Sequence, residues 1–330
     1  MLADSDFYST VLPRRNAVVE RRRILRVVER SSPEILARDQ VSVIVVNHNA
    51  GSLLGSCVRR ALDQAREVIV VDNASSDGSC QAIHAAMEAN GRLKLSLNTR
   101  NLGFSVACNM GAALGTGKYL LFLNPDCMVE PGALGRMLAA VERDGRAGMA
   151  GGLLSHPDGT EQPGGRRAVP TPWRSFVRAF GLSRFGERWP RLFASYDLCA
   201  QPIPSVPVEV EAISGACMLV RREAYEDVGP LDEGYFMHCE DLDWCMRFRQ
   251  KGWKVIFVPE AKVVHHLGTC SRGRPFFVEW HKHRGMVRFY RKFFSHQYPG
   301  PMLFAVVAAV WARFAGKVVM IQVKRLLGKS

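Results

Sequence analysis

Short apolar runs alternate with helical patterns along the first half of the chain. Four runs have the length and residue types of buried strands, at residues 41–46, 68–71, 93–97 and 119–123. Three segments between these runs carry apolar residues at helical spacing, at residues 53–65, 81–89 and 105–114. Apolar strands separated by helices are typical of a parallel sheet covered on both faces. The pattern therefore predicts an α/β fold with a doubly wound, mostly parallel central sheet flanked by helices.

The second half of the chain is less regular. Pro131 occupies the expected first position of a helix that runs to Val141, because proline fits the first turn of a helix. Residues 155–204 are rich in Pro, Gly and Arg and predict a long irregular insertion over the functional edge of the sheet. After it we expect strands in VPVEVEAISGACMLVRR and WKVIFVPE, a short helix closed by Gly229 and a longer helix that ends at Gly252.

Both ends of the chain are basic. Residues 1–39 form an Arg-rich extension, and residues 296–330 predict an amphipathic helix with Arg313, Lys317 and Lys324 on one face. The opposite face of this helix carries Phe304, Trp311, Val318 and Gln322. Such a helix either lies in an anionic membrane interface or packs on the main domain, and the sequence leaves both open.

The chain has a formal net charge of +13, which suits nucleic acid, anionic lipid or an anionic substrate as a partner. The arginines gather in the termini and in residues 160–191 without a recognisable nucleic-acid-binding motif, which argues against nucleic acid. The cysteines are scattered and form no CxxC pair, which indicates a reducing compartment.

No stretch has the pattern of a signal peptide or of a membrane span. The N-terminal residues lack the apolar core of a signal peptide. The longest charge-free apolar stretch near the C-terminus covers residues 299–312, which is shorter than the ~18 to 20 residues that a spanning helix needs. We therefore expect a cytoplasmic protein, held peripherally at the inner face of the cell membrane.

Polar residues follow the predicted strands where these end. Asn47 and Asn49 follow the first strand, Asp72 and Asn73 the second, and Asp126 the fourth. Because the carboxyl ends of parallel strands meet at one edge of a sheet, these side chains are expected to face a nucleotide or a cation there.

The motifs of the chain, in their order, resemble those of the family 2 glycosyltransferases, and most closely the rhamnosyltransferase-like branch. The matching segments are VSVIVVNHN, VIVVDNASSDGS, NLGFSVACNMG, KYLLFLNPD and HCEDLDWCMR. The resemblance covers about residues 41 to 295 and implies a GT-A fold. It also implies inverting transfer of rhamnose, or another deoxyhexose or hexose, from a dTDP- or UDP-sugar. The acceptor would be a lipid-linked sugar or a polysaccharide of the cell surface.

The resemblance implies that Asp72 accepts a hydrogen bond from the nucleotide base. The whole set of donor-binding residues that we expect is Val45, Asn47, Asn49, Asp72, Asn73, Arg100, Asn101, Gly103, Asn109 and Asn124. Three members have a structural alternative: Asp72 as a turn residue, Asn109 as a helix-packing residue and Arg100 as a surface charge.

Asp126 resembles the last carboxylate of the family's DxD metal motif. The first acid of that motif is replaced here by Asn124, so the site offers fewer anionic ligands. The segment PEAKVVH resembles the family's motif for a metal-binding histidine, which makes His265 the expected second ligand and His266 the alternative. Mg²⁺ or Mn²⁺ is the expected cation, since both offset the charge of a diphosphate.

The segment HCEDLDWCMR resembles the family's ED motif, which makes Asp241 the expected catalytic base and Glu240 its neighbour that orients it or binds the acceptor. The structural alternative is that these acids complement the dipole of a helix N-terminus. Ser214, Gly215 and Asp232 resemble the family's acceptor-side segments and are the expected acceptor-binding residues.

We therefore expect residues 40–295 to form the transferase domain. Its nucleotide-binding half would cover residues 40–150 and its acceptor half residues 151–295. The alternatives are a nucleotide-sugar-binding protein or a nucleotidyltransferase on a related fold, followed by a nucleic-acid-binding protein. A nucleotidyltransferase would need a Gly-rich basic loop after the first strand, and the sequence there has none.

Overall fold

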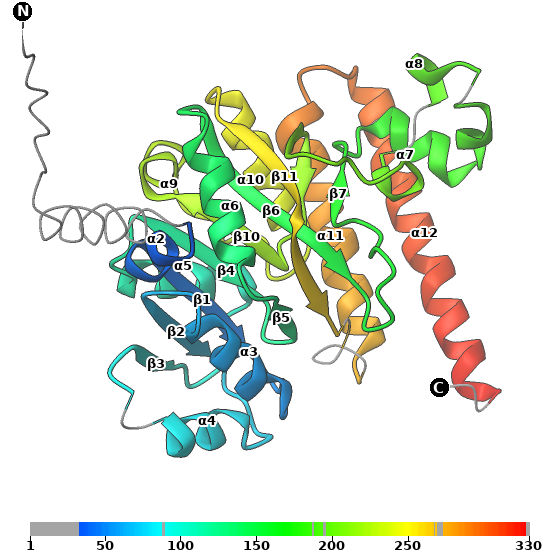
Figure 1. The fold of residues 1–330 in the computed structure, drawn as a ribbon. Coiled ribbons are helices and arrows are strands. Elements are labelled where there is room, and N and C mark those ends of the chain that lie inside the picture. The colour runs from blue at the N-terminus through cyan, green and yellow to red at the C-terminus, as the bar shows by residue number, and fades with distance from the viewer. Residues whose placement is uncertain are drawn as a thin grey trace, which may run out of the picture.

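A large mixed sheet runs through the centre of the molecule (Figure 1). The structure, a computed structural model, describes residues 33–327 apart from 88–89, 187, 194–195, 267 and 269–272. The strands of this sheet are β1 Val41–Asn47, β2 Glu67–Asp72, β3 Leu93–Leu97, β4 Tyr119–Leu123, β5 Cys127–Val129, β6 Ala147–Ser155, β8 Val208–Val210, β10 Cys217–Arg221 and β11 Lys254–His265. Their order is β3-β2-β1-β4-β10-β6-β11-β5, with β8 paired to β11.

The first four strands are parallel, as their unbroken apolar character predicts. In register, Asn47 at the end of β1 lies opposite Asp72 at the end of β2. β10 runs antiparallel between β4 and β6, with Cys217 opposite Leu123, so β10 begins at the edge where β4 ends. The parallel strands and the start of β10 therefore bring their polar flanking residues to one edge.

Helices cover both faces of the sheet, which confirms the predicted layers (Figure 1). The helices of the main domain are α2 Pro33–Gln40, α3 Leu53–Leu62, α4 Ser79–Met87, α5 Phe104–Leu114, α6 Ala133–Glu142, α9 Arg222–Val228, α10 Glu240–Gln250 and α11 Pro275–Phe294. Val43 and Val45 of β1 join one apolar core with α3 and α6, while Ile44 and Val46 join the other with α5, α10 and α11. Alternate side chains of a strand point to opposite faces, so one β-branched run serves both cores.

The insertion at residues 155–204 is more ordered than its composition predicts. It contains α7 Pro172–Ala179, the short 3₁₀ helices η1 Leu182–Phe185 and η2 Leu198–Ala200, and α8 Pro190–Phe193. Its strand β7 Arg166–Arg167 pairs with β9 Ala212–Ile213 in a separate two-stranded sheet. Pairing partners this far apart in sequence leave no local periodicity, which is why the pattern did not predict them.

Two predicted boundaries were wrong. Pro131 precedes α6 by two residues, because Gly132 takes a left-handed φ of 77° and caps a helix that begins at Ala133. The strand expected in WKVIFVPE continues to His265 as one strand, β11, whose register with β6 shifts between Val258 and Lys262.

The C-terminal segment forms one helix, α12 Gly300–Leu326. Its first half packs on α11, with the rings of Trp311 and Trp280 5.3 Å apart and those of Phe314 and Trp280 5.6 Å apart. Trp311 therefore lies against protein, whereas Phe304 is 74% exposed. The expectation that no segment is long enough to span a membrane was wrong. By length and composition alone, α12 is long and apolar enough to cross a membrane. The sequence argument counted only a charge-free stretch, and α12 continues through Arg313 and Lys317. Residues 1–32 of the basic extension lie outside the described part.

Candidate active site

A cavity of about 350 Å³ opens at the carboxyl edge of β1, β2 and β4. It gathers ten of the residues predicted from sequence: Asn73, Asn101, Gly103, Asn124, Asp126, Ser214, Gly215, Glu240, Asp241 and His265. Donor-side, metal-side and acceptor-side candidates thus share one cavity. Val46, His48 and Phe236 also line it.

Asp72 lies just behind this cavity, in a network that holds the loop after β2. Its carboxylate accepts hydrogen bonds from Asn47 Nδ2 at 2.7 Å, from Ser75 Oγ at 2.6 Å and from the Ser75 amide at 3.0 Å. Asn49 has a φ of 59°, and its backbone amide also binds Ser75 Oγ. Asn47, Asn49 and Asp72 therefore shape the loop that presents Asn73 to the cavity.

Asn73 joins the loops that follow β2 and β3. Its Nδ2 donates to the carbonyl of Gly103 at 3.0 Å, and its Oδ1 accepts from Asn98 at 2.9 Å. Gly103 has a φ of 91°, and a Cβ there would meet the carbonyl oxygen of Phe236 at 2.8 Å. The amide of Phe104 donates to that same oxygen at 2.7 Å. Only glycine allows this approach between the donor-side loop and the segment before α10.

Besides Asn47, Asn49 and Asp72, four other predicted residues do not line the cavity. Val45 is fully buried within β1, and Arg100 lies on the exposed loop before α5. Asn109 binds the backbone of Leu231 with both its amide atoms, which is the helix-packing role considered for it. Asp232 binds Arg288 and Lys292 of α11, and these hydrogen bonds outweigh its burial and lower its pKa to about 2.

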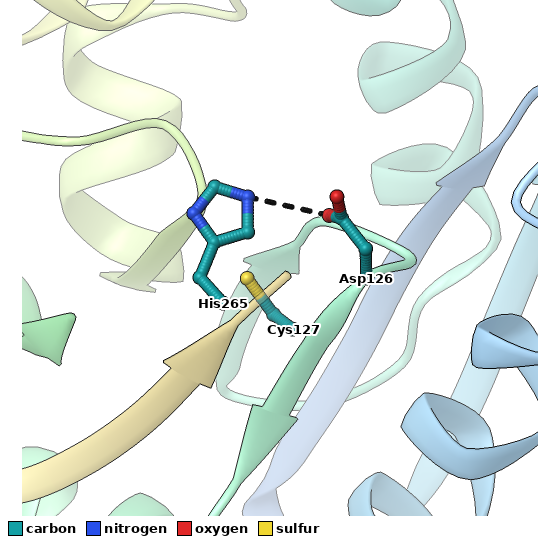
Figure 2. A group of neighbouring side chains, drawn as sticks. All are labelled: Asp126, Cys127 and His265. Atoms are coloured by element: carbon teal, nitrogen blue, oxygen red, sulfur yellow. Dashed lines mark ion pairs between the residues drawn. The ribbon is translucent and has the colours of Figure 1, made fainter. Parts of the chain in front are cut away.

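Asp126 and His265 form the arrangement predicted for a cation (Figure 2). His265 Nε2 lies 3.3 Å from Asp126 Oδ1, and both side chains are buried. Gln162 Nε2 donates to the carbonyl of His265 at 2.6 Å, so Gln162 Oε1, 2.8 Å from His265 Nδ1, is left to accept a hydrogen bond from the N–H of that ring nitrogen. The ring then presents the lone pair of Nε2 to the carboxylate. The amide of His266 donates to the Asp126 carbonyl, which fixes the strand beneath.

This donor set fits a divalent cation. A carboxylate oxygen and an imidazole lone pair that face each other suit Mn²⁺ well and Mg²⁺ with added water or phosphate oxygens. The thiol of Cys127 lies close enough to join them, but burial and then the nearby Asp126 charge raise its pKa well above the ordinary value. Among the described residues, Cys239 and Cys245 do not belong to this group.

Asp241 and Glu240 occupy the first turn of α10 and face the same cavity. Asp241 accepts hydrogen bonds from the amide of Gly215 at 2.9 Å and from the guanidinium of Arg167. Burial disfavours the charged form of Arg167, but the charge of Asp241, the nearby Cys245 and Cys239 and the hydrogen bond to Asp241 together raise the pKa of the arginine. Glu240 Oε2 is buried and has no hydrogen-bond partner among the described residues. Burial, and then the charge of Asp241, raises the pKa of Glu240 to about 8.

The backbone before α10 is unusual. His238 and Cys239 are consecutive residues other than glycine with positive φ values, 65° and 71°. Left-handed residues of this kind cost free energy and persist where the surroundings fix them. α11 approaches the segment closely, since a Cβ at Gly285 would meet the His238 carbonyl oxygen at 2.9 Å. This packing sets the start of α10 and the direction of its first carboxylates.

The residues of the site that sequence reasoning missed include Arg167, Gln162, His48 and Phe236. Arg167 and Gln162 come from the insertion, where no motif marks them. His48 binds the carbonyl of Asn73 at 2.9 Å and stands between two predicted asparagines. Its place within VVNHN was the one available signal.

The fold and this cavity suit a glycosyltransferase, and comparison with known proteins agrees. The family model "Glycosyl transferase family 2" matches residues 42–229. The chain therefore belongs to glycosyltransferase family 2. The predicted α/β fold of GT-A type is confirmed, and the readings as a nucleotidyltransferase or a nucleic-acid-binding protein are set aside.

A curated relative is the N-acetylglucosaminyl-diphospho-decaprenol L-rhamnosyltransferase of Mycobacterium tuberculosis. It is 32% identical over 250 residues, which cover 72% of this chain and 78% of the relative. Among solved structures, a mannosyltransferase from Pyrobaculum calidifontis in complex with GDP-Man and Mn²⁺ has a TM-score of 0.52 at 18% identity, covering 95% of this chain and 88% of the other. The structure of GalNAc-T7 with UDP, GalNAc and Mn²⁺ also gives 0.52, at 20% identity, covering 68% and 43%.

Proposed function

We propose that this protein is an inverting rhamnosyltransferase. It transfers the sugar from a dTDP- or UDP-linked donor to a lipid-linked sugar in the synthesis of a cell-surface glycan. Two findings support the choice of substrates: the acceptor named for the mycobacterial relative, and the nucleotide sugars named for the solved neighbours. Transfer of a related deoxyhexose or hexose, or transfer to a polysaccharide, is the second candidate.

The observation that carries this proposal is the pairing of two sites in one cavity. The Asp126–His265 pair fits a cation, and the Glu240–Asp241 pair offers a proton acceptor a short way along the same cavity. Sugar transfer from a nucleoside diphosphate needs both, because charge develops on the leaving group while the acceptor loses a proton. When bound, Mn²⁺ or Mg²⁺ would offset the charge on the diphosphate.

We assign donor binding to residues 40–150. His48, Asn73 and Asn101 hold the base and ribose, with Asp72 as the carboxylate that orders their loop and accepts from the base. Gly103 lets the chain approach the donor closely, and Asn124 lies beside the diphosphate. Asn47 and Asn49 support this site from behind through Ser75.

We assign acceptor binding and the chemical step to residues 151–295. The acceptor hydroxyl gives its proton to the Asp241 carboxylate while its oxygen forms the bond to the anomeric carbon. The bond from that carbon to the phosphate oxygen breaks on the opposite face, so the configuration inverts. Gly215 and Arg167 hold Asp241 in its orientation, and Ser214 and Glu240 border the acceptor.

We also place the enzyme at the inner face of the cell membrane. A lipid-linked acceptor confines its sugar to the membrane surface, so attachment would bring the cavity to the substrate. Beyond Phe314, α12 exposes apolar residues together with Lys317 and Lys324. Such a helix suits an anionic interface.

A donor screen tests this function. Purified protein would be incubated with UDP-, GDP- and dTDP-sugars and a lipid-linked N-acetylglucosamine acceptor, with Mn²⁺ or Mg²⁺, and released nucleoside diphosphate measured. We expect acceptor-dependent release that is greatest with a rhamnosyl donor and is abolished by a chelator. Release from none of these donors would contradict the proposal, and greatest release from another sugar would favour the second candidate.

A further inference from the structure

The insertion carries an exposed unit made of α7, η1 and α8. Its residues, 172–193, include five arginines and six aromatic residues but a single acid, Glu187. Figure 1 shows this unit at the side of the molecule away from β3 and α4. The proposed chemistry uses none of its side chains, so its composition calls for another explanation.

One stripe of α7 points its aromatic side chains outward. Trp173, Phe176 and Phe180 stand three and four residues apart, which places them on one side of the helix. They are 43%, 44% and 65% exposed, and neighbouring rings lie 5.5 and 4.5 Å apart. α7 docks on the domain through the buried Val177 and through Ser175, whose hydroxyl lies 2.7 Å from that of Tyr290 on α11. The outward rings are therefore not required by the core.

Three more residues, from η1 to α8, extend this apolar patch. Phe185, Trp189 and Leu192 are 38%, 47% and 54% exposed. Trp173 Nε1 donates to the carbonyl of Leu192 at 2.7 Å, which fastens α8 to α7. A contiguous exposed patch of large apolar residues is rare on a soluble monomer and marks an interaction surface.

The positive charges of this unit indicate an anionic partner. The guanidinium carbons of Arg184 and Arg188 lie over the rings of Phe185 and Trp189, at 4.9 and 5.1 Å. Within the described residues, neither arginine makes an ion pair, whereas Arg174 and Arg178 are paired with Glu211 and Asp197. The guanidinium groups of Arg184 and Arg188 lie beside exposed aromatic rings. This combination complements the surface of a phospholipid bilayer, where phosphate groups lie above an apolar layer.

We propose that residues 172–193 are a second membrane-docking element, which binds an anionic phospholipid bilayer. The rings of Trp173, Phe176 and Phe180 enter the boundary between headgroups and acyl chains, and Arg184 and Arg188 bind lipid phosphate. α7 and α12 both brace against α11, through Tyr290 and Trp280 respectively. Because α7 and α12 are both packed on α11, attachment through both fixes the orientation of the catalytic domain on the membrane. Attachment through α12 alone would leave the domain free to tilt.

Vesicle flotation with the full chain tests this element without any sugar donor. The aromatic variant is Trp173→Ser/Phe176→Ser/Phe180→Ser, and the charge variant is Arg184→Gln/Arg188→Gln. We expect each to lower binding to phosphatidylglycerol vesicles at least ~10-fold, with a smaller effect on phosphatidylcholine vesicles for the charge variant. The matched control is Leu97→Ser/Leu114→Ser, which removes exposed apolar residues from the other half of the domain and should bind as the unmodified chain does.

Hydrogen exchange of the unmodified protein provides a readout that no folding defect can imitate. The amides of residues 172–193 should become protected when phosphatidylglycerol vesicles are added. Unchanged exchange in this segment, together with unchanged flotation of both variants, would overturn the proposal. So would a dimer in sedimentation that the aromatic variant abolishes, since the patch would then bind a second copy. Donor turnover is measured separately, so failure here leaves the transferase function standing.

Discussion

The guanidinium of Arg167, on β7, donates a hydrogen bond to the carboxylate of Asp241, in the first turn of α10. The pair joins the insertion to the proposed catalytic base, although the two residues lie 74 positions apart in sequence. It also supplies the positive charge beside two adjacent carboxylates, those of Asp241 and Glu240. The insertion is thus part of the active site and more than a cover for it.

Removing this cation should change the pH dependence of the reaction. In Arg167→Ala, Asp241 loses its positive neighbour, so the charged form of the base is disfavoured. The acidic limb of the kcat/KM profile should then move to higher pH, by about 1 to 3 units. Arg167→Lys keeps the charge and should restore much of the original profile. A uniform loss of rate with an unshifted profile would assign Arg167 a structural role alone.

Asp241→Asn tests the base itself. Without a carboxylate to take the acceptor proton, transfer should fall by on the order of 10² to 10⁴-fold, while donor binding persists because the donor side of the cavity is intact. Turnover and calorimetric donor affinity would be measured together. Asp227→Asn, an exposed aspartate on α9, is the matched control and should be fully active. Near-normal turnover of Asp241→Asn would remove this residue from the mechanism.

Glu240 should make the folded protein less stable as the pH rises. Its pKa is raised from 4.5 in the unfolded chain to about 8 in the folded one, chiefly by burial, so the folded state holds a proton that the unfolded state loses between these values. Glu240→Gln removes this penalty. The variant should be more stable than the parent at pH 8 to 9, by on the order of 1 kcal/mol or more, with little difference at pH 4. Denaturant titrations at the two pH values measure this, and an equal gain at both would point to another cause.

The metal site yields a graded series. Asp126→Ala should abolish Mn²⁺-dependent binding of nucleoside diphosphate, His265→Ala should weaken it, and His266→Ala should weaken it less. Gln162→Ala leaves both ligands but frees the imidazole ring, so metal affinity should fall about 10- to 100-fold. Calorimetry with and without a chelator gives each value. Affinity that ignores both the chelator and Asp126→Ala would mean that the enzyme works without metal.

The distal half of α12 should attach the protein to anionic membranes. A chain that ends at Gly316 keeps Trp311 and Phe314 on α11, whereas a cut after Tyr298 would uncover Trp280. The shorter chain should bind anionic vesicles more weakly than the full chain while still hydrolysing donor. The full chain should dissociate as salt rises, because each cation contributes ~1 kcal/mol and is screened over ~8 Å at physiological salt. Lys317→Arg/Lys324→Arg preserves charge and should bind normally; equal binding of the truncated chain would make α12 a packing element.

Local pattern predicted much of the fold. The strands β1 to β4 and the helices between them follow directly from apolar runs and their periodicity, because each is buried in a way that its own residues record. The pattern also pointed to Asp126 after the fourth strand, whereas His265 and Asp241 were indicated by resemblance to the family's motifs.

The rest of the site depends on contacts that no local pattern records. Arg167 reaches Asp241 only because β7 pairs with β9, and Gln162 reaches His265 only because the insertion folds back over the end of β11. Asp232 shows the opposite failure. Its segment matched the family, yet Arg288 and Lys292 hold it on α11, outside the cavity.

The contact between Gly103 and Phe236 joins the two halves of the domain, and it also restricts how the sequences of the two loops can change. A residue larger than glycine at position 103 would displace the segment that leads into His238, Cys239 and the first turn of α10. The sequence and conformation of the loop at Gly103 therefore cannot change independently of the loop that leads into α10. An enzyme whose loop at Gly103 adapts to another nucleotide must keep this glycine, or the loop that leads into α10 must change its conformation at the same time.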